Sequence, residues 1–156
     1  MKIEGYTAFV LDDVTRERLL ERFPPAYPAK RATHVTEQFG APANAVLPDR
    51  KANIRITGIA DDGIGSQALV AEVDGVCINP YNQNPYHITL SFDPSKKIPI
   101  QPTPPGKPRS EYYDSSYSGV MLQEGRVPVT PIEPPIEITG TLKYVDKNAE
   151  LRPKRI

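Results

Sequence analysis

Strand and helix patterns alternate at the start of the chain. Residues 5–11 are rich in β-branched and aromatic side chains, a composition typical of a strand. Residues 14–23 are good helix formers, with Asp12 or Asp13 available as the N-terminal cap and Pro24–Pro25 to end the helix. The pattern therefore predicts a strand followed directly by a helix, with an apolar stripe formed by Val14, Leu19, Leu20 and Phe23.

Later segments of the chain are typical of strands, either because polar and apolar positions alternate at a two-residue period or because turn-forming residues bound a short apolar run. Between residues 53–60 and 68–73 stands the turn-forming cluster Asp61-Asp62-Gly63, so these two segments predict a hairpin. The predicted later strands cover residues 32–39, 53–60, 68–73, 86–92 and 136–145.

The segment 86–92 shows the clearest alternation, and it follows a loop predicted for residues 79–85. Its apolar positions are Tyr86, Ile88, Leu90 and Phe92, and its polar positions are His87, Thr89 and Ser91. Successive side chains of a strand point to opposite faces of a sheet. We therefore expect the apolar set to pack on the core and the histidine face to line a cleft or to meet solvent.

Proline makes up 18 of the 156 residues, more than twice its average share of about 5%. Ten of these prolines fall between Pro94 and Pro135, so this stretch predicts a rigid, extended loop region with a short helix at residues 109–117. The elements together predict one α+β domain over residues 1–156, in which an antiparallel sheet forms a central cleft, a helix packs outside, and the two histidine strands lie near the middle.

Charge and cysteine content narrow the classes of partner. Lys and Arg number 19 and Asp and Glu number 19, so no overall positive field exists to hold long duplex nucleic acid. Cys77 is the single cysteine, which excludes an internal disulfide, and its apolar neighbours predict a buried thiol. No signal peptide or membrane-spanning stretch is evident, so we expect a cytoplasmic protein without a membrane partner.

The two histidines of the chain share one motif. His34-Val35-Thr36 and His87-Ile88-Thr89 each place a histidine and a threonine on the same strand face, a double match expected by chance roughly once in 250. Two imidazoles across a cleft can act as base and acid on a phosphodiester near neutral pH, because their ordinary pKa lies near that range. The threonine hydroxyls can donate to the non-bridging phosphate oxygens. We assign His34 as the base and His87 as the acid, an assignment that the sequence leaves exchangeable.

These motifs resemble those of the two-histidine phosphoesterase superfamily, and the whole-chain layout is most similar to the phage-encoded enzymes that degrade cyclic oligonucleotide messengers of bacterial antiviral signalling. The similarity covers most of residues 5–145 and is carried by Gly5-Tyr6, Phe23-Pro24-Pro25, Thr33-His34-Val35-Thr36, Phe39-Gly40, the segment Pro85–Ser91, and Gly106-Lys107-Pro108. It implies a two-lobed antiparallel sheet with a central cleft and flanking helices. It also implies metal-independent cleavage of a 3′,5′-phosphodiester, with His34, Thr36, His87 and Thr89 as the catalytic residues.

Further residues are candidates for substrate binding. Tyr6, Tyr86 and Tyr112 can stack on nucleobases, and Tyr113 neighbours the last of these. Lys107 and Arg109 can close over phosphates, as can Lys30 and Arg31. A zinc site is disfavoured because there is no third histidine and no His-x-x-x-His or Cys-x-x-Cys spacing, so no cofactor is expected.

Three functions remain open at this stage. In the first, the substrate is a small cyclic oligonucleotide cut by its own 2′-hydroxyl to a 2′,3′-cyclic phosphate. In the second, it is a linear RNA end that carries a 2′,3′-cyclic phosphate, processed by the same four residues. In the third, the protein is a non-catalytic sponge that returns its nucleotide intact.

Overall fold

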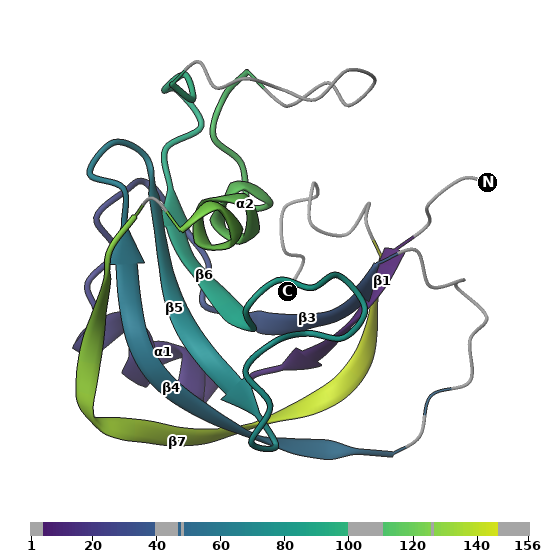
Figure 1. Cartoon of the computed structure of the whole chain (residues 1–156). Helices are drawn as coiled ribbons and strands as arrows, with labels where there is room; N and C mark the ends of the chain where they lie inside the picture. The colour runs from purple at the N-terminus through teal and green to yellow at the C-terminus, as the bar shows by residue number, and fades with distance from the viewer. Residues whose placement is uncertain (1–4, 40–46, 48, 100–110, 126, 147–156) are drawn as a thin grey trace.

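The computed structural model describes residues 5–39, 47, 49–99, 111–125 and 127–146. Within these ranges the chain forms an α+β fold in which seven strands make one antiparallel sheet, accompanied by two helices (Figure 1). The elements are β1 Gly5–Val10, α1 Asp13–Arg22, β2 Ala29–Lys30, β3 His34–Phe39, β4 Lys51–Asp61, β5 Ser66–Val73, β6 His87–Phe92, α2 Tyr117–Glu124 and β7 Val129–Asp146. No helix in the described part of the chain is long and apolar enough to cross a membrane.

The strand order is β2–β6–β5–β4–β7–β1–β3, and every pair is antiparallel. The two motif strands β3 and β6 therefore stand near opposite ends of the order, and the prediction that they lie near its middle is wrong. β2 pairs with β6 and is followed directly in the chain by β3. In the short link between them, the amides of Arg31 and Ala32 donate to the carbonyls of Leu90 and Thr89 of β6, at 2.8 Å each. The sheet consequently curls until β3 lies beside β6 (Figure 1).

Each face of the curled sheet packs on its own helix. The larger core joins Leu19 and Leu20 of α1, together with its C-cap Phe23, to one face, and the smaller core joins α2 to the other. A bulge between Ile56 and Gly58 of β4 shifts the register, so that Ile56 belongs to the first core and Ala60 to the second. One strand thereby serves both faces.

The first helix matches its prediction closely. Asp12 is the N-cap, and its Oδ1 accepts a hydrogen bond of 2.7 Å from the amide of Thr15. The predicted stripe packs through Leu19, Leu20 and Phe23, whereas Val14 stays 59% exposed because it lies in the first turn, outside the contact with the sheet. The hairpin of β4 and β5 is also confirmed.

The predicted last strand begins too late. β7 extends back to Val129, and Pro131 pairs with Gly58 while Ile136 pairs with Ile56. The residues between these two pairings are not in the ladder, and two of them are prolines, which cannot donate a ladder hydrogen bond. The register between β4 and β7 is therefore irregular at these prolines. This irregularity allows β7 to include a proline-rich segment that the sequence pattern assigns to a loop.

The helix predicted over residues 109–117 is wrong. Residues 111–116 are not helical, residues 109 and 110 lie outside the described chain, and α2 begins at Tyr117. Asp114 Oδ1 accepts hydrogen bonds from the amide and the hydroxyl of Ser116, at 3.0 and 2.5 Å, which holds this stretch as a turn. The helix is stabilised by burial of its apolar residues on the smaller core, a tertiary effect that local composition does not report.

The predicted burial of Cys77 is also wrong, because the thiol is exposed. Asp74 and Gly75 turn the chain with φ of 49° and 83°, and Val73 pairs with Val76 across this turn. The apolar run Val76–Ile78 therefore stands on a tight turn outside the sheet, with Val76 48% exposed.

Candidate active site

The two His-x-Thr motifs, 53 positions apart along the chain, line one cavity of about 220 Å³. The cavity lies where β3 meets β6, below the N-terminal end of α2. Its wall consists of Tyr6, Arg31, Thr33, His34, Thr36, Asn82, Asn84, His87, Thr89, Ser115, Ser116 and Gly119. The expectation that the histidine face of residues 86–92 lines a cleft or meets solvent is therefore confirmed, and the histidine face of β3 lines the same cavity.

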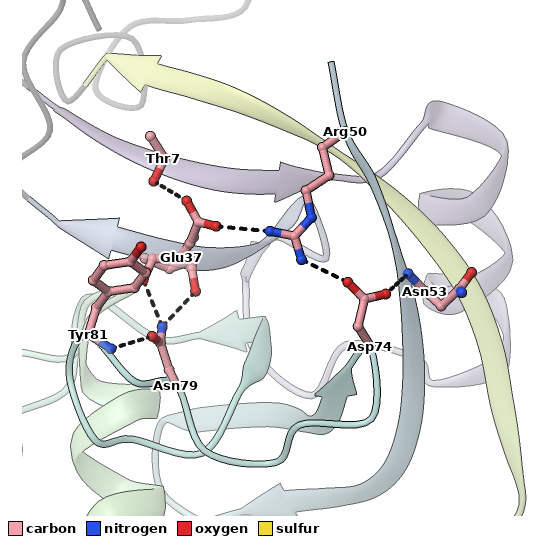
Figure 2. Close-up of polar contacts among 8 residues, drawn as sticks. Thr7, Glu37, Arg50, Asn53, Asp74, Asn79 and Tyr81 are labelled. Carbon is pink, nitrogen blue, oxygen red and sulfur yellow. Dashed lines mark hydrogen bonds and ion pairs between the residues drawn. The ribbon is translucent and has the colours of Figure 1, made fainter. Parts of the chain in front are cut away.

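A buried asparagine joins the two sides of the cavity. Asn79 is 2% exposed, and its Nδ2 donates to the carbonyls of Thr36 and Glu37 of β3, at 3.1 and 2.8 Å. Its Oδ1 accepts from the amide of Tyr81, at 2.9 Å (Figure 2). The loop that leads into β6 is thus fixed directly to the strand that carries His34.

Hydroxyl groups hold the ring of His34 at both nitrogens. Thr33 Oγ1 lies 2.7 Å from Nδ1, and the hydroxyl of Tyr6 lies 3.2 Å from Nε2. The tyrosine ring also packs on the imidazole, with centroids 5.2 Å apart. Each hydroxyl oxygen can accept a hydrogen bond from an N–H group of the ring. The surroundings of His34 therefore suit an imidazolium, which has two N–H groups, as well as a neutral ring.

His87 is held as a single tautomer. Its Nδ1 lies 2.8 Å from the carbonyl oxygen of Pro85, which can only accept, so Nδ1 carries the hydrogen and Nε2 of the neutral ring keeps its lone pair. Burial lowers the pKa of His87 from its ordinary value of 6.5, opposed by the smaller effect of the bond to Pro85. His87 is therefore neutral at pH 7, in the form required of a proton acceptor.

The lowered pKa of His87 makes the stability of the fold depend on pH. Below pH 6.5, the imidazole of His87 is protonated in the unfolded chain but remains neutral in the folded chain until the pH falls to its lowered pKa. Acidification from about pH 7.5 to about pH 5.5 should therefore destabilise the native protein more than a His87→Gln variant. Urea unfolding of both proteins at each pH measures this difference, and equal losses would contradict it.

The two threonines of the motifs are used differently. Thr36 lines the cavity, while its carbonyl accepts from Asn79. Thr89 Oγ1 donates to the carbonyl of Ser115, at 3.1 Å, and lies 2.7 Å from the hydroxyl of Ser118, which is fully buried. The side chain of Thr89 therefore ties β6 to the first turn of α2, a role that the motif alone does not predict.

The N-terminal end of α2 forms one wall of the cavity through Ser115, Ser116 and Gly119. The first amides of a helix lack intrahelical acceptors, and the helix dipole places partial positive charge at this end. An anion in the cavity would meet both effects. Sequence reasoning missed this wall because it placed the helix at residues 109–117, about two turns before α2.

The charges around the cavity favour an anion. Among its described wall residues Arg31 is the one Lys or Arg, and no Asp or Glu is present. The guanidinium of Arg31 lies 4.9 Å from the ring centre of Phe92, which fixes it beside the cavity. With two imidazoles, hydroxyls and amides, the wall offers hydrogen-bond donors on several sides.

The other predicted binding residues are distributed unevenly. Tyr6 and Arg31 line the cavity. Tyr86 belongs to the larger core and is 7% exposed, and Tyr112 is 43% exposed and lies outside the cavity wall. Tyr86 points away from His87 because neighbouring residues of a strand face opposite sides. Tyr113 is buried and donates to Asp62, and Lys30 is exposed outside the wall. Lys107 and Arg109 lie outside the described residues.

The wall also contains residues that were not predicted. These are Thr33, Asn82, Asn84, Ser115, Ser116 and Gly119. The position of Thr33 next to His34, and the three asparagines in the loop before His87, were visible signals in the sequence.

A second, larger hollow of about 720 Å³ lies between α1, β4 and β7. Its wall includes Arg18, Arg22 and Arg55 over an apolar floor, but no histidine, cysteine or tyrosine. It therefore lacks a group that exchanges protons near neutral pH, and the smaller cavity is the better candidate for catalysis. In the described part of the chain, no three His, Cys, Asp or Glu side chains gather as a ligand set for a metal ion.

Comparison of the chain with family models, curated proteins and solved structures found no match. The function must therefore be argued from the residues and the geometry of the cavity.

Proposed function

We propose that the protein is a metal-independent phosphodiesterase in which His87 and His34 act as base and acid. The observation that carries this proposal is that both histidines, the only ones in the chain, line a single cavity whose described wall holds no carboxylate. A phosphodiester in this cavity would lie between the two rings. Its charge would face Arg31 and the N-terminal end of α2.

The environment of His87 supports an exchange of the roles assigned from the sequence. Nε2 of His87 has the lone pair and the lowered pKa of a base at pH 7. His34, between the oxygens of Thr33 and Tyr6, suits the acid, because both oxygens can accept its N–H groups. In the reaction, His87 takes the proton of the attacking hydroxyl, a new P–O bond forms, the opposite P–O bond breaks, and His34 protonates the departing oxygen.

We further propose membership of the two-histidine phosphoesterase superfamily. The curled sheet supports a two-lobed reading, since β3 and β1 with the end of β7 carry His34, whereas β4, β5 and β6 carry His87. Each half contributes one His-x-Thr motif to the cavity. The small size of the cavity and the balanced net charge favour a small nucleotide over a long nucleic acid. The sequence resemblance adds cyclic oligonucleotide messengers, as degraded by phages that evade bacterial immunity, as the first substrate class to test.

The test is incubation of the purified protein, with EDTA present, with cyclic di- and trinucleotides and with a linear RNA that ends in a 2′,3′-cyclic phosphate. Mass spectrometry of the products identifies the bond cut. Cleavage that persists in EDTA and that His87→Gln lowers by about 100-fold or more is the expected result. Cleavage of the linear end alone would indicate RNA-end processing, and ligands bound but returned intact would indicate a sponge.

A further inference from the structure

The strand β1 brings a tyrosine to His34. β1 pairs with β3, so that Ala8 lies opposite Thr36 and Val10 lies opposite His34 (Figure 1). Tyr6 is on the same face of β1 as Ala8, because the two residues are two positions apart. The long side chain of Tyr6 reaches along the strand, and its hydroxyl oxygen lies 3.2 Å from Nε2 of His34. A residue of one strand is thus the hydrogen-bond partner of a histidine on the next.

Both nitrogens of the His34 ring face hydroxyl groups. Nδ1 lies 2.7 Å from Oγ1 of Thr33, and Nε2 lies 3.2 Å from the oxygen of Tyr6. In the imidazolium form each nitrogen carries one hydrogen, which lies in the plane of the ring and points in a single direction. A proton that leaves the ring toward either of these partners therefore meets a hydroxyl group before it meets a substrate.

The two hydroxyl groups line the same cavity but differ in acidity. The phenol of tyrosine is a far stronger acid than the aliphatic alcohol of threonine, and tyrosine is among the side chains that act in general acid catalysis. Tyr6 is also well fixed, since the residue is 3% exposed and its ring packs on the imidazole. Tyr6 is therefore the better group to pass a proton onward, and Thr33 the better group to orient the ring.

We infer that Tyr6 is a catalytic residue that carries the proton of His34 to the departing oxygen of the substrate. This inference rests on the proposed phosphodiesterase function and adds one step to it. A hydroxyl group can donate one hydrogen while it accepts another, so it can stand between an acid and the group that the acid protonates. The step uses the hydroxyl group of Tyr6, whereas the stacking expected from the sequence would use its ring.

The transfer restores the tyrosine. The bond from phosphorus to the leaving oxygen breaks, and this oxygen forms a bond to the hydrogen of the Tyr6 hydroxyl group. The oxygen of Tyr6 takes the hydrogen of Nε2 in exchange, so His34 passes from imidazolium to neutral imidazole. His87 has gained the proton of the attacking hydroxyl group, so protons balance and no further reactant is needed.

The experiment measures kcat of Tyr6→Phe on a cyclic dinucleotide and on a nucleoside 4-nitrophenyl phosphodiester, whose leaving group departs without a proton. The variant keeps the ring and loses the hydroxyl group. On the dinucleotide kcat should fall about 100-fold or more with little change in KM, whereas on the nitrophenyl substrate it should stay close to that of the wild type. Adding Tyr6→Phe to His34→Gln should cause little further loss on the dinucleotide, because the two residues act on one proton.

A fluorinated tyrosine separates proton transfer from simple positioning of His34. With 3,5-difluorotyrosine at position 6, the phenol loses its proton near neutral pH. A phenolate still accepts a hydrogen bond from His34 but has no hydrogen to pass on. Relative to the wild type, kcat on the dinucleotide should therefore fall as the pH rises through neutrality, while kcat on the nitrophenyl substrate should not.

A matched control is Tyr81→Phe, which removes an exposed hydroxyl group that is not among the described wall residues of the cavity. Its kcat should match that of the wild type on both substrates. Wild-type kcat in Tyr6→Phe on the dinucleotide, or an equal loss on both substrates, would overturn the inference alone. Full activity of the fluorinated protein above neutral pH would also overturn it. Absence of turnover by the wild type with every substrate would instead remove the proposed function and this inference with it.

Discussion

His87→Gln and His34→Gln are each expected to lower kcat by about 10²- to 10⁴-fold on a natural nucleotide, the range associated with loss of one general acid or base. Binding should largely persist in both variants, because Arg31 and the end of α2 remain beside the phosphate. Rates at saturating substrate, with affinities measured separately by calorimetry, test this expectation.

The chemistry of the leaving group separates the two roles. A 4-nitrophenolate leaves without a proton, so a nucleoside 4-nitrophenyl phosphodiester makes the general acid unnecessary while the base is still required. His34→Gln should therefore recover most of its activity on this substrate, and His87→Gln should not. This asymmetry follows from Nε2 of His87, which is left with its lone pair by the bond to Pro85.

Gln38→Ala serves as the control, because Gln38 is exposed on the same strand as His34 and lies outside the cavity wall. It should behave as the wild type on both substrates. Recovery of His87→Gln instead of His34→Gln would restore the roles assigned from the sequence. Recovery of neither variant would mean that proton transfer to the leaving oxygen does not limit the reaction.

The period of the strands explains why the core of the site could be predicted. Residues two positions apart on a strand lie on the same face of the sheet. His34 therefore shares a face with Thr36, and His87 shares a face with Thr89. The same rule excludes Tyr86 from the cavity, since it precedes His87 by one position. What the pattern lacked was the strand order, which depends on the segment between β2 and β3 closing the curled sheet.

The missed parts of the fold have tertiary causes. α2 contains Gly119, a poor helix former, yet this glycine lets the helix approach His87 closely, because a Cβ atom there would lie 3.3 Å from the imidazole. The helix is stabilised by packing on β5 and β6. The early part of β7 contains prolines, which local rules assign to loops. Neither feature can be read from local composition, because each depends on residues distant in the chain.

Asn79 is expected to be the residue on which the shape of the cavity most depends. Replacing it with alanine removes two N–H donors from the carbonyls of Thr36 and Glu37 and one acceptor from the amide of Tyr81. We expect Asn79→Ala to lower the free energy of unfolding by about 2–4 kcal/mol, whereas Gln38→Ala should change it by less than about 0.5 kcal/mol. Urea denaturation of the two variants measures both values.

The effect of Asn79→Ala should extend to activity, because of what surrounds the asparagine. Glu37 also accepts a hydrogen bond from Thr7, at 3.0 Å, and lies 3.8 Å from Arg50. Arg50 itself donates to Asp74, at 2.8 Å (Figure 2). These contacts hold β3 to β1 and to the turn after β5, whereas the side chain of Asn79 joins β3 to the loop that carries Asn84.

At a temperature where Asn79→Ala remains folded, β3 should therefore stay in the sheet while the loop moves relative to it. That movement separates His34 from Asn84 and His87, so kcat should fall even in the folded variant. Circular dichroism at the assay temperature establishes that the variant is folded. A folded variant with wild-type kcat would show that the sheet alone sets the distance between the histidines, and that the asparagine contributes only stability.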